Sequence, residues 1–304
     1  MKTLRKLLVV ALLLAIAAGG TYLWMRANVA PGQPGEPFLV RYDRARGLQT
    51  VLEDLKARGV VKNPAALRLY VWLYRKPAWI GAGTYSLRPG MSADDLLSAL
   101  QSPIRQMVRI PETNFSNRTA KLLALPEYRV ADAAEYLRLV KTPSEFAGTV
   151  NFPLPKTSLE GYLYPDTYDL PPLLGARGVI ERQLQAFERE AWPLLRKAKD
   201  PYRVLIIASL IELEVAKDRE RPIVAGVIEN RLARGEALGI DAALNYGLGE
   251  WRPLTKADLQ LDSPYNLRKV KGLPPTPICS PSVKSIKAAL TPAKHGFYYY
   301  VAVG

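Results

Sequence analysis

The most continuous apolar stretch of the chain lies close to its N-terminus. Residues 7–25 are all apolar or glycine, apart from Thr21 and the amphipathic Tyr22. At about 1.5 Å per residue, a helix of this length nearly matches a hydrocarbon core of about 30 Å. The pattern therefore predicts a transmembrane helix over residues 7–25, preceded by a short N-terminus of residues 1–6.

The charges on either side of this stretch predict its orientation. Lys2, Arg5 and Lys6 precede it, whereas Arg26 alone follows directly. Because an excess of basic residues marks the cytoplasmic side, we expect the N-terminus in the cytoplasm and the rest of the chain outside the membrane. A cleaved signal peptide is the alternative, since Ala15-Ile16-Ala17 has the small-x-small form of a cleavage site.

Residues 26–37 predict a linker, because they are rich in proline and glycine and have no periodicity. Residues 38–110 then alternate between strand-like and helix-like patterns, which predicts a small α+β module. Strands are expected at 38–42, 84–87 and 106–110, and helices at 48–55, after Asn63-Pro64 and after Ser92. Residues 85–93 resemble a LysM repeat, a module that binds N-acetylglucosamine polymers. A purely structural role is the alternative.

From residue 111 to 304 the pattern predicts a helix-rich α+β domain. Amphipathic helices are expected at 117–125, 130–140 and 178–198, and the apolar run at 204–217 predicts a buried helix. Pro222 can begin a further helix, with a buried stripe of Ile223, Val224, Val227, Ile228 and Leu232. A helix at 285–290 and a strand at 297–303 complete the pattern. The whole chain is thus predicted to be an α+β protein behind a membrane helix.

The composition excludes several kinds of partner and functional site. Lys and Arg number 42 against 28 Asp and Glu, a net charge of +14 that favours anionic partners. Export argues against nucleic acid as that partner. Cys279 and His295 are each the single residue of their type, so an intramolecular disulfide and a multi-histidine metal site are excluded. We therefore expect no metal and no cofactor, and interpret Cys279 as a small buried residue.

Two glutamates near the end of the apolar helix are candidate catalytic groups. On a helix, Glu212 and Glu214 point about 200° apart, so they cannot serve one site side by side. Glu212 shares its face with Ala208, Ser209 and Ala216, whose small side chains leave room for a ligand. Glu214 lies among apolar residues, so burial should raise its pKa. Alternatively, either glutamate pairs with Lys217, Arg219 or Arg221.

Three further segments carry candidate site residues. Residues 160–168 hold three tyrosines and two carboxylates, which predicts a turn with exposed aromatic faces for sugar rings; a packed structural turn is the alternative. Residues 239–247 are expected to form a loop that supplies Asp241 and Tyr246. Residues 262–282 are rich in proline, which predicts a rigid extended loop and a groove wall.

The segments EGYLYPDTY (160–168), ASLIELE (208–214) and DSPYNLRKVKGLPPTPICSPSVKSIKAALTPAK (262–294) together resemble the endolytic murein transglycosylase (YceG-like) family. The resemblance implies a single-span protein of the bacterial inner membrane that cuts peptidoglycan glycan strands internally. The family's catalytic glutamate falls on Glu212. Other recurrent motif positions are Glu160, Asp166, Glu220, Asn230, Arg231, Asp241, Tyr265 and Asn266. The same segments supply further candidates for binding substrate or supporting the site: Tyr164, Tyr168, Ser209, Glu214, Tyr246 and Ser263.

The sequence also departs from the family pattern. The family usually has Gly-Pro where Thr276-Pro277 stands, and Asn-Pro-Gly where residues 280–282 read Ser-Pro-Ser. It also usually continues beyond a final strand, whereas this sequence stops at Gly304.

The implied chemistry needs a single carboxyl. One glutamate protonates the glycosidic oxygen and then, as a carboxylate, takes the proton from the C6 hydroxyl of N-acetylmuramic acid. That hydroxyl attacks C1 and leaves a 1,6-anhydro end, so proximity replaces a second carboxylate and water. Expected partners are peptidoglycan glycan strands, the membrane and peptidoglycan synthases. The alternatives are a muramidase-type hydrolase with Asp166, Glu160 or Asp241 as second carboxylate, and a non-catalytic glycan-binding scaffold for wall synthases.

Overall fold

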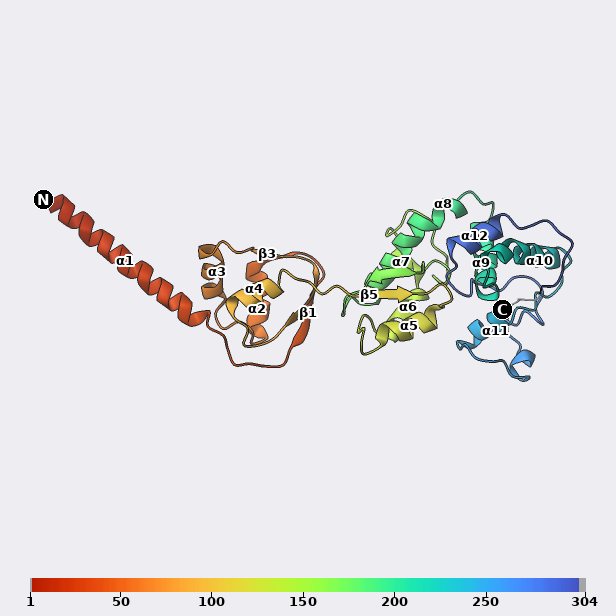
Figure 1. The fold of residues 1–304 in the computed structure, drawn as a ribbon, viewed down its shortest axis with the longest axis horizontal. Coiled ribbons are helices and arrows are strands. Elements are labelled where there is room, and N and C mark those ends of the chain that lie inside the picture. Colours follow the sequence, from red (N-terminus) through yellow and green to blue (C-terminus); the bar gives the residue numbers. More distant parts are fainter. Residues whose placement is uncertain (1, 301–304) are drawn as a thin grey trace. The chain divides into compact units, whose positions relative to one another are not determined.

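The computed structural model describes residues 2–300, which divide into two compact units (Figure 1). The first unit runs to Arg105 and includes Pro171–Leu173. The second unit comprises Gln106–Leu170 and the chain from Leu174 onward. Each unit buries a hydrophobic core of its own.

An uninterrupted helix, α1 (Lys2–Asn28), opens the first unit (Figure 1). Its residues Thr3–Asn28 are long and apolar enough to cross a membrane, and most of their side chains are exposed. The helix thus includes the span predicted at 7–25 and extends beyond both of its ends. Met25, in the last two turns, is fully buried against the rest of the unit.

The rest of the first unit confirms the predicted strands and helices. β1 (Phe38–Tyr42) pairs antiparallel with β4 (Gly83–Leu87), and β2 (Arg46–Gly47) with β3 (Trp79–Ile80). Three helices pack around them: α2 (Leu48–Ala57), α3 (Pro64–Leu73) and α4 (Ala93–Ala99). As expected, Asn63 caps α3 by accepting hydrogen bonds from two backbone N–H groups, and the Ser92 hydroxyl caps α4.

A third strand pair lies in the second unit. β5 (Met107–Ile110) pairs antiparallel with β6 (Asp166–Asp169), so that Val108 faces Tyr168. The sequence analysis grouped residues 106–110 with the first module and expected a turn through residue 168. The difference arises because the strand partners lie about sixty residues apart, and no local pattern shows that they pair.

The helices of the second unit mostly follow the predicted pattern. α6 begins at Ala133 rather than at residue 130, because the Asp132 side chain caps it. The long helix expected at 178–198 divides into α7 and α8, with Pro193 in the first turn of α8. The second unit contains α5 (Ser116–Ala124), α6 (Ala133–Val140), α7 (Ala176–Glu190), α8 (Trp192–Leu195), α9 (Pro201–Glu214), α10 (Arg221–Ala233), α11 (Asp241–Leu248) and α12 (Val283–Leu290), with 3-10 turns at Pro143–Phe146, Asp218–Glu220 and Asp258–Gln260.

Three expectations were wrong in this unit. Residues 241–248 form helix α11, where a loop was expected, because Ala242, Ala243 and Leu244 are buried in the core. Ile223 is 40% exposed and does not belong to the buried stripe of α10. Residues 297–300 form no strand, and the remainder of the strand expected at 297–303 lies outside the described residues.

Helices α9, α10 and α12 pack against one another in the middle of the second unit. Pro201 begins α9 and Asp200 caps it by accepting a hydrogen bond from the Arg203 N–H. Every residue from Leu205 to Glu212 is buried, as expected for a helix that is apolar on all sides. This packing fixes the last turn of α9, and with it Glu212, in the interior.

Candidate active site

Glu212 lies in the last turn of α9, and its side chain is only 5% exposed. The helix ends two residues later, where Val215 adopts an extended conformation. A carboxylate this deeply buried needs hydrogen-bond donors, because an unpaired buried charge is strongly unfavourable.

Three donors from two other helices meet this carboxylate. Arg221, the first residue of α10, donates from Nη1 to Oε1 at 3.1 Å. Ser282, directly before α12, donates from its backbone N at 2.8 Å and from its hydroxyl at 2.6 Å, both to Oε2. Each oxygen of Glu212 is therefore held by a donor outside α9, which fixes the orientation of the carboxyl group.

Arg221 is itself held by several partners. Its side chain is 10% exposed, and its Nη1 also donates to the Ser285 hydroxyl. Nε donates to Asp218 at 3.1 Å, and Lys284 binds the other oxygen of Asp218 at 2.6 Å. The sequence analysis named Arg221 as a possible partner of either glutamate, and the structure pairs it with Glu212.

Of the three small residues on the face of Glu212, Ala216 is exposed and lines a cavity with Glu212, as the sequence suggested, whereas the other two do not. Ala208 and Ser209 are fully buried. The Ser209 hydroxyl accepts from the Ile278 N–H at 3.0 Å and donates to the Ile206 carbonyl, while the Cys279 thiol lies against the Ser209 carbonyl. The proline-rich loop therefore covers Ser209, and Ser209 holds that loop on α9. Cys279 is fully buried, as predicted.

The proline-rich loop also packs against the turn that carries Glu160. Gly161 has a φ of +88°, and a Cβ placed there would lie 2.6 Å from both Cβ and Cγ of Pro277. Only glycine combines this backbone conformation with so close an approach. The motif residues 160–161 and the proline-rich loop thus form one packed structure.

A surface groove leads to Glu212. A cavity of about 480 Å³ is lined by Glu212, Arg221, Ser282 and Lys284 together with Glu112 and Tyr164. A second cavity of about 410 Å³ shares Glu112 and Tyr164 and continues to Asp166. The two cavities share lining residues and therefore lie next to each other, and together we call them the Glu212 groove.

A separate cavity of about 450 Å³ surrounds Glu160. Tyr246 and Tyr265 line it, with ring centroids 5.1 Å apart, and Glu160 accepts hydrogen bonds from both the backbone N and the hydroxyl of Ser116. Burial raises the pKa of Glu160 to about 7, although the hydrogen bonds from Ser116 oppose the shift. Glu160 is therefore a carboxyl that changes charge near neutral pH.

The turn at 160–168 is more buried than expected. Tyr162 and Tyr168 pack in the core, and the Tyr168 hydroxyl donates to the Tyr164 carbonyl at 2.6 Å. Tyr164 is half-buried and Asp166 is exposed, and these two face the Glu212 groove. Exposed aromatic faces for sugar rings are therefore limited to Tyr164 in this segment.

Several candidate residues line neither cavity. They instead make hydrogen bonds or ion pairs that hold neighbouring segments of the chain in place. The Asn230 amide donates to the carbonyls of His295 and Phe297, and Arg231 donates to those of Ala237 and Tyr298. The remaining residues of this kind are Asn266, which donates to the carbonyls of Leu259 and Leu261; Asp241, paired with Arg268; Ser263, which accepts from the Tyr265 N–H; and Glu220, 4.0 Å from Arg219.

Glu214 points away from Glu212, as its helical position predicted. It accepts a hydrogen bond from the Tyr300 hydroxyl at 2.9 Å, and burial raises its pKa, as expected. It lines neither the Glu212 groove nor the Glu160 cavity.

Sequence analysis did not single out Ser282, Glu112 or Ser116. A signal existed for Ser282, because serine before a helical pattern is a typical N-cap and Ser282 does cap α12. Within residues 2–300, no cluster of three or more His, Cys, Asp or Glu side chains could hold a metal ion.

Two relatives found by comparison with known proteins carry the same name. The endolytic murein transglycosylase of Streptococcus pneumoniae serotype 2 (strain D39 / NCTC 7466) is 30% identical over 294 residues, covering 84% of this chain and 52% of the relative. The protein of the same name from Bacillus subtilis (strain 168) is 28% identical over 309 residues, covering 93% and 84%. The chain thus spans about half the length of the streptococcal relative.

A solved structure and a family pattern agree with these relatives. The crystal structure of a YceG-like protein from Listeria monocytogenes superposes with a TM-score of 0.58 at 28% identity, covering 88% of this chain and 94% of that one. Residues 40–304 match the pattern of the YceG-like family. Because that match covers most of the sequence, the chain belongs to the YceG-like family.

Proposed function

We propose that this chain is a lytic transglycosylase that cuts peptidoglycan glycan strands internally, with Glu212 as its catalytic acid and base. The observation that carries the proposal is a single buried carboxyl that lines the Glu212 groove and is held by Arg221 and Ser282. The names of the streptococcal and Bacillus relatives support the same activity.

The geometry suits a reaction in which one carboxyl acts twice. Glu212, in its protonated form, gives its proton to the glycosidic oxygen between N-acetylmuramic acid and N-acetylglucosamine. The resulting carboxylate accepts the proton of the C6 hydroxyl while that oxygen attacks C1, so a 1,6-anhydro end forms without water. Arg221 and Ser282 stabilise the carboxylate formed between the two steps and keep it aimed into the groove.

The remaining candidate residues have proposed roles in holding the glycan strand. Tyr164 offers a partly exposed ring along the groove, and Asp166 offers a carboxylate that can accept hydrogen bonds from sugar hydroxyls. Glu160, Tyr246 and Tyr265 could take a further sugar in the separate cavity. Ser209, Asn230, Arg231 and Asn266 support the surrounding loops through the contacts described above.

The first unit is proposed to place this site outside the bacterial inner membrane. α1 would span the bilayer with its N-terminus in the cytoplasm, because more basic residues precede its apolar part than follow it. Residues 38–105 of the first unit would act as a LysM-like glycan-binding part, and the second unit as the catalytic part. Peptidoglycan synthases are proposed partners, with termination or trimming of nascent strands as the outcome.

The test is mass spectrometry of purified peptidoglycan digested by the detergent-solubilised full chain. Glu212→Gln should abolish internal fragments with anhydro ends. Glu214→Gln is the matched control, because glutamine still accepts from the Tyr300 hydroxyl and Glu214 lies outside the groove. We expect the control to retain activity.

Other product patterns would identify the alternative functions. Fragments heavier by one water, with reducing ends, would indicate a muramidase-type hydrolase; Glu112, which lines the same cavity as Glu212, would then be a further candidate for the second carboxylate. Equal product from the wild type and Glu212→Gln would refute the catalytic role of Glu212. No product from either protein would favour a glycan-binding scaffold.

A further inference from the structure

The first unit exposes a run of aromatic and basic side chains at the end of α3. Every residue from Trp72 to Trp79 is exposed, with Trp72 at 75% and Trp79 at 69%. Leu73 and Tyr74 are exposed as well, and Arg75 and Lys76 follow them. Tryptophan and tyrosine next to basic residues are typical of the interface between a membrane and water.

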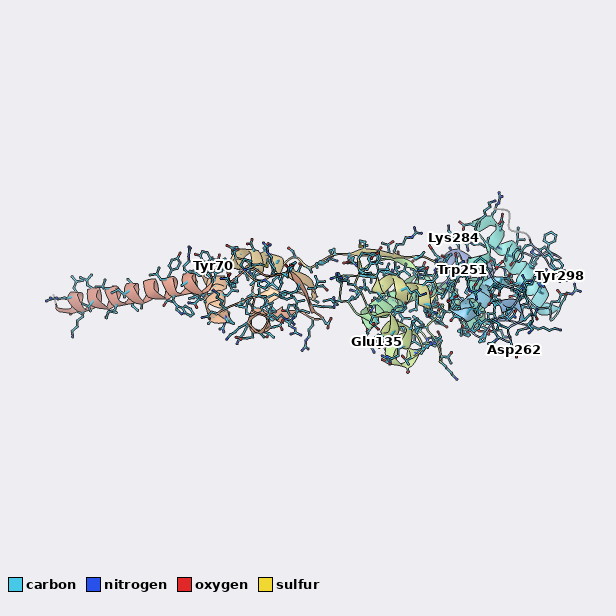
Figure 2. All side chains as sticks on the ribbon, turned by 90° about the horizontal axis from the view of Figure 1, so that it is seen from below. Tyr70, Glu135, Trp251, Asp262, Lys284 and Tyr298 are labelled. Atoms are coloured by element: carbon cyan, nitrogen blue, oxygen red, sulfur yellow. The ribbon has the colours of Figure 1, made fainter. Side chains whose placement is uncertain are left out.

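This run lies next to the end of the apolar helix. Met25 of α1 is fully buried where α1 and α3 pack together. The Asn63 amide donates to the Asn28 side chain at 3.3 Å. Figure 2 shows Tyr70 of α3 beside the last turns of α1. The contact between the two helices therefore lies at the end of α1, around residues 25–28.

Simple dimensions place α3 close to the bilayer. From Met25 to Asn28, α1 rises three steps of about 1.5 Å, or about 4.5 Å. Outside the hydrocarbon core, the headgroup region on each side is about 5–8 Å thick. A helix with its side chains is about 10 Å wide. If α1 crosses the membrane with residues 7–25 in the hydrocarbon, α3 overlaps the headgroup region.

We propose that α3 and residues 72–76 lie in the lipid headgroup layer of the membrane that α1 crosses. We call these residues, 64–76, the interfacial segment. Their aromatic side chains would sit between headgroups, and the basic groups of Arg68 and Arg75, both exposed, would face lipid phosphates. The first unit would then rest on the lipid surface instead of moving freely above it. This inference depends on the membrane anchor in the proposed function and goes beyond it.

Nitroxide spin labels measure the depth of single positions. The full chain with Cys279→Ala, which removes its one cysteine, is reconstituted into phosphatidylcholine–phosphatidylglycerol vesicles. A label is attached to Trp72→Cys in the interfacial segment or to Asp43→Cys, directly after β1, a strand that lies away from α1 in the first unit (Figure 1). Leu13→Cys in α1 reports insertion of the anchor, and Leu73→Cys repeats the first measurement at a neighbouring site.

The readout is the ratio of nitroxide collisions with oxygen, which concentrates in lipid, to collisions with a water-soluble nickel chelate. We expect a several-fold higher ratio at positions 72 and 73 than at 43, and the highest ratio at 13. Membrane depth at 13 with equal ratios at 72, 73 and 43 would overturn the proposal while the anchor stands. A water-like ratio at 13 would overturn the anchor and the proposal together.

Discussion

Replacing Gly161 by alanine tests whether the proline-rich loop holds the Glu160 turn by direct contact. Gly161 has a φ of +88°, where a side chain costs about 1–2 kcal/mol. The new Cβ would also lie 2.6 Å from two atoms of the Pro277 ring, and such overpacking costs about 1–3 kcal/mol. We therefore expect the free energy of unfolding of the second unit to fall by about 2–5 kcal/mol.

Gly148 provides the matched control. Its φ is +82°, but a Cβ there would meet no atom within 4 Å, so Gly148→Ala should cost only about 1–2 kcal/mol. Because the two units need not unfold together, urea unfolding of the full chain is followed by amide hydrogen exchange in α9. Equal losses in the two variants would refute the packing argument, because they would show that backbone strain alone acts at Gly161.

Two further predictions concern the carboxyl groups. Burial raises the pKa of Glu160 from 4.5 to about 7, so the protonated carboxyl favours the folded state. This contribution is complete below pH 4.5 and is lost as the pH rises through 7. The free energy of unfolding of the second unit should therefore fall by roughly 3 kcal/mol over this range. Because glutamine stays neutral, the urea midpoint of Glu160→Gln should change less between pH 4.5 and 7 than that of the wild type. An equal pH dependence of the midpoint in both proteins would contradict the raised pKa of Glu160. Ser282→Ala removes the 2.6 Å donor to Glu212 and should slow strand cleavage roughly 10- to 100-fold, since a hydrogen bond to a charged group is worth about 1.5–3 kcal/mol. Ser92→Ala, which removes a similar cap from α4, should leave the rate unchanged, and a wild-type rate in Ser282→Ala would exclude Ser282 from the reaction.

Local signals in the sequence predicted much of the fold. Asn63-Pro64, Ser92 and Pro222 each mark a helix start with a chemical reason, and all three helices begin there or within one residue. Elements stabilised by distant contacts were missed. β6 forms because β5 lies beside it, and α11 forms because its short apolar run is buried by the core. Neither condition is visible in a window of ten residues.

The candidate site shows the same contrast between local signals, which the sequence reveals, and distant contacts, which it does not. Helical spacing separated the two glutamates and predicted the buried environment of Glu214, and the family resemblance pointed to Glu212, but the number and identity of the donors to Glu212 depended on the tertiary fold. Small residues beside Glu212 suggested an open space, and Ala216 does line a cavity there, whereas the loop at Ile278 and Cys279 covers Ser209. Side-chain size along a helix describes one wall of a site, and the opposite wall comes from another part of the chain.

The order of the residues around Glu212 has a consequence for when the centre becomes complete. Arg221 follows Glu212 by 9 positions and Ser282 by 70. In the proposed topology, export starts from the N-terminus, so Glu212 would leave the membrane channel before Ser282. The carboxyl group would then reach the cell envelope without its donors from Ser282, and the proposed site would be complete only after α12 has packed against α9.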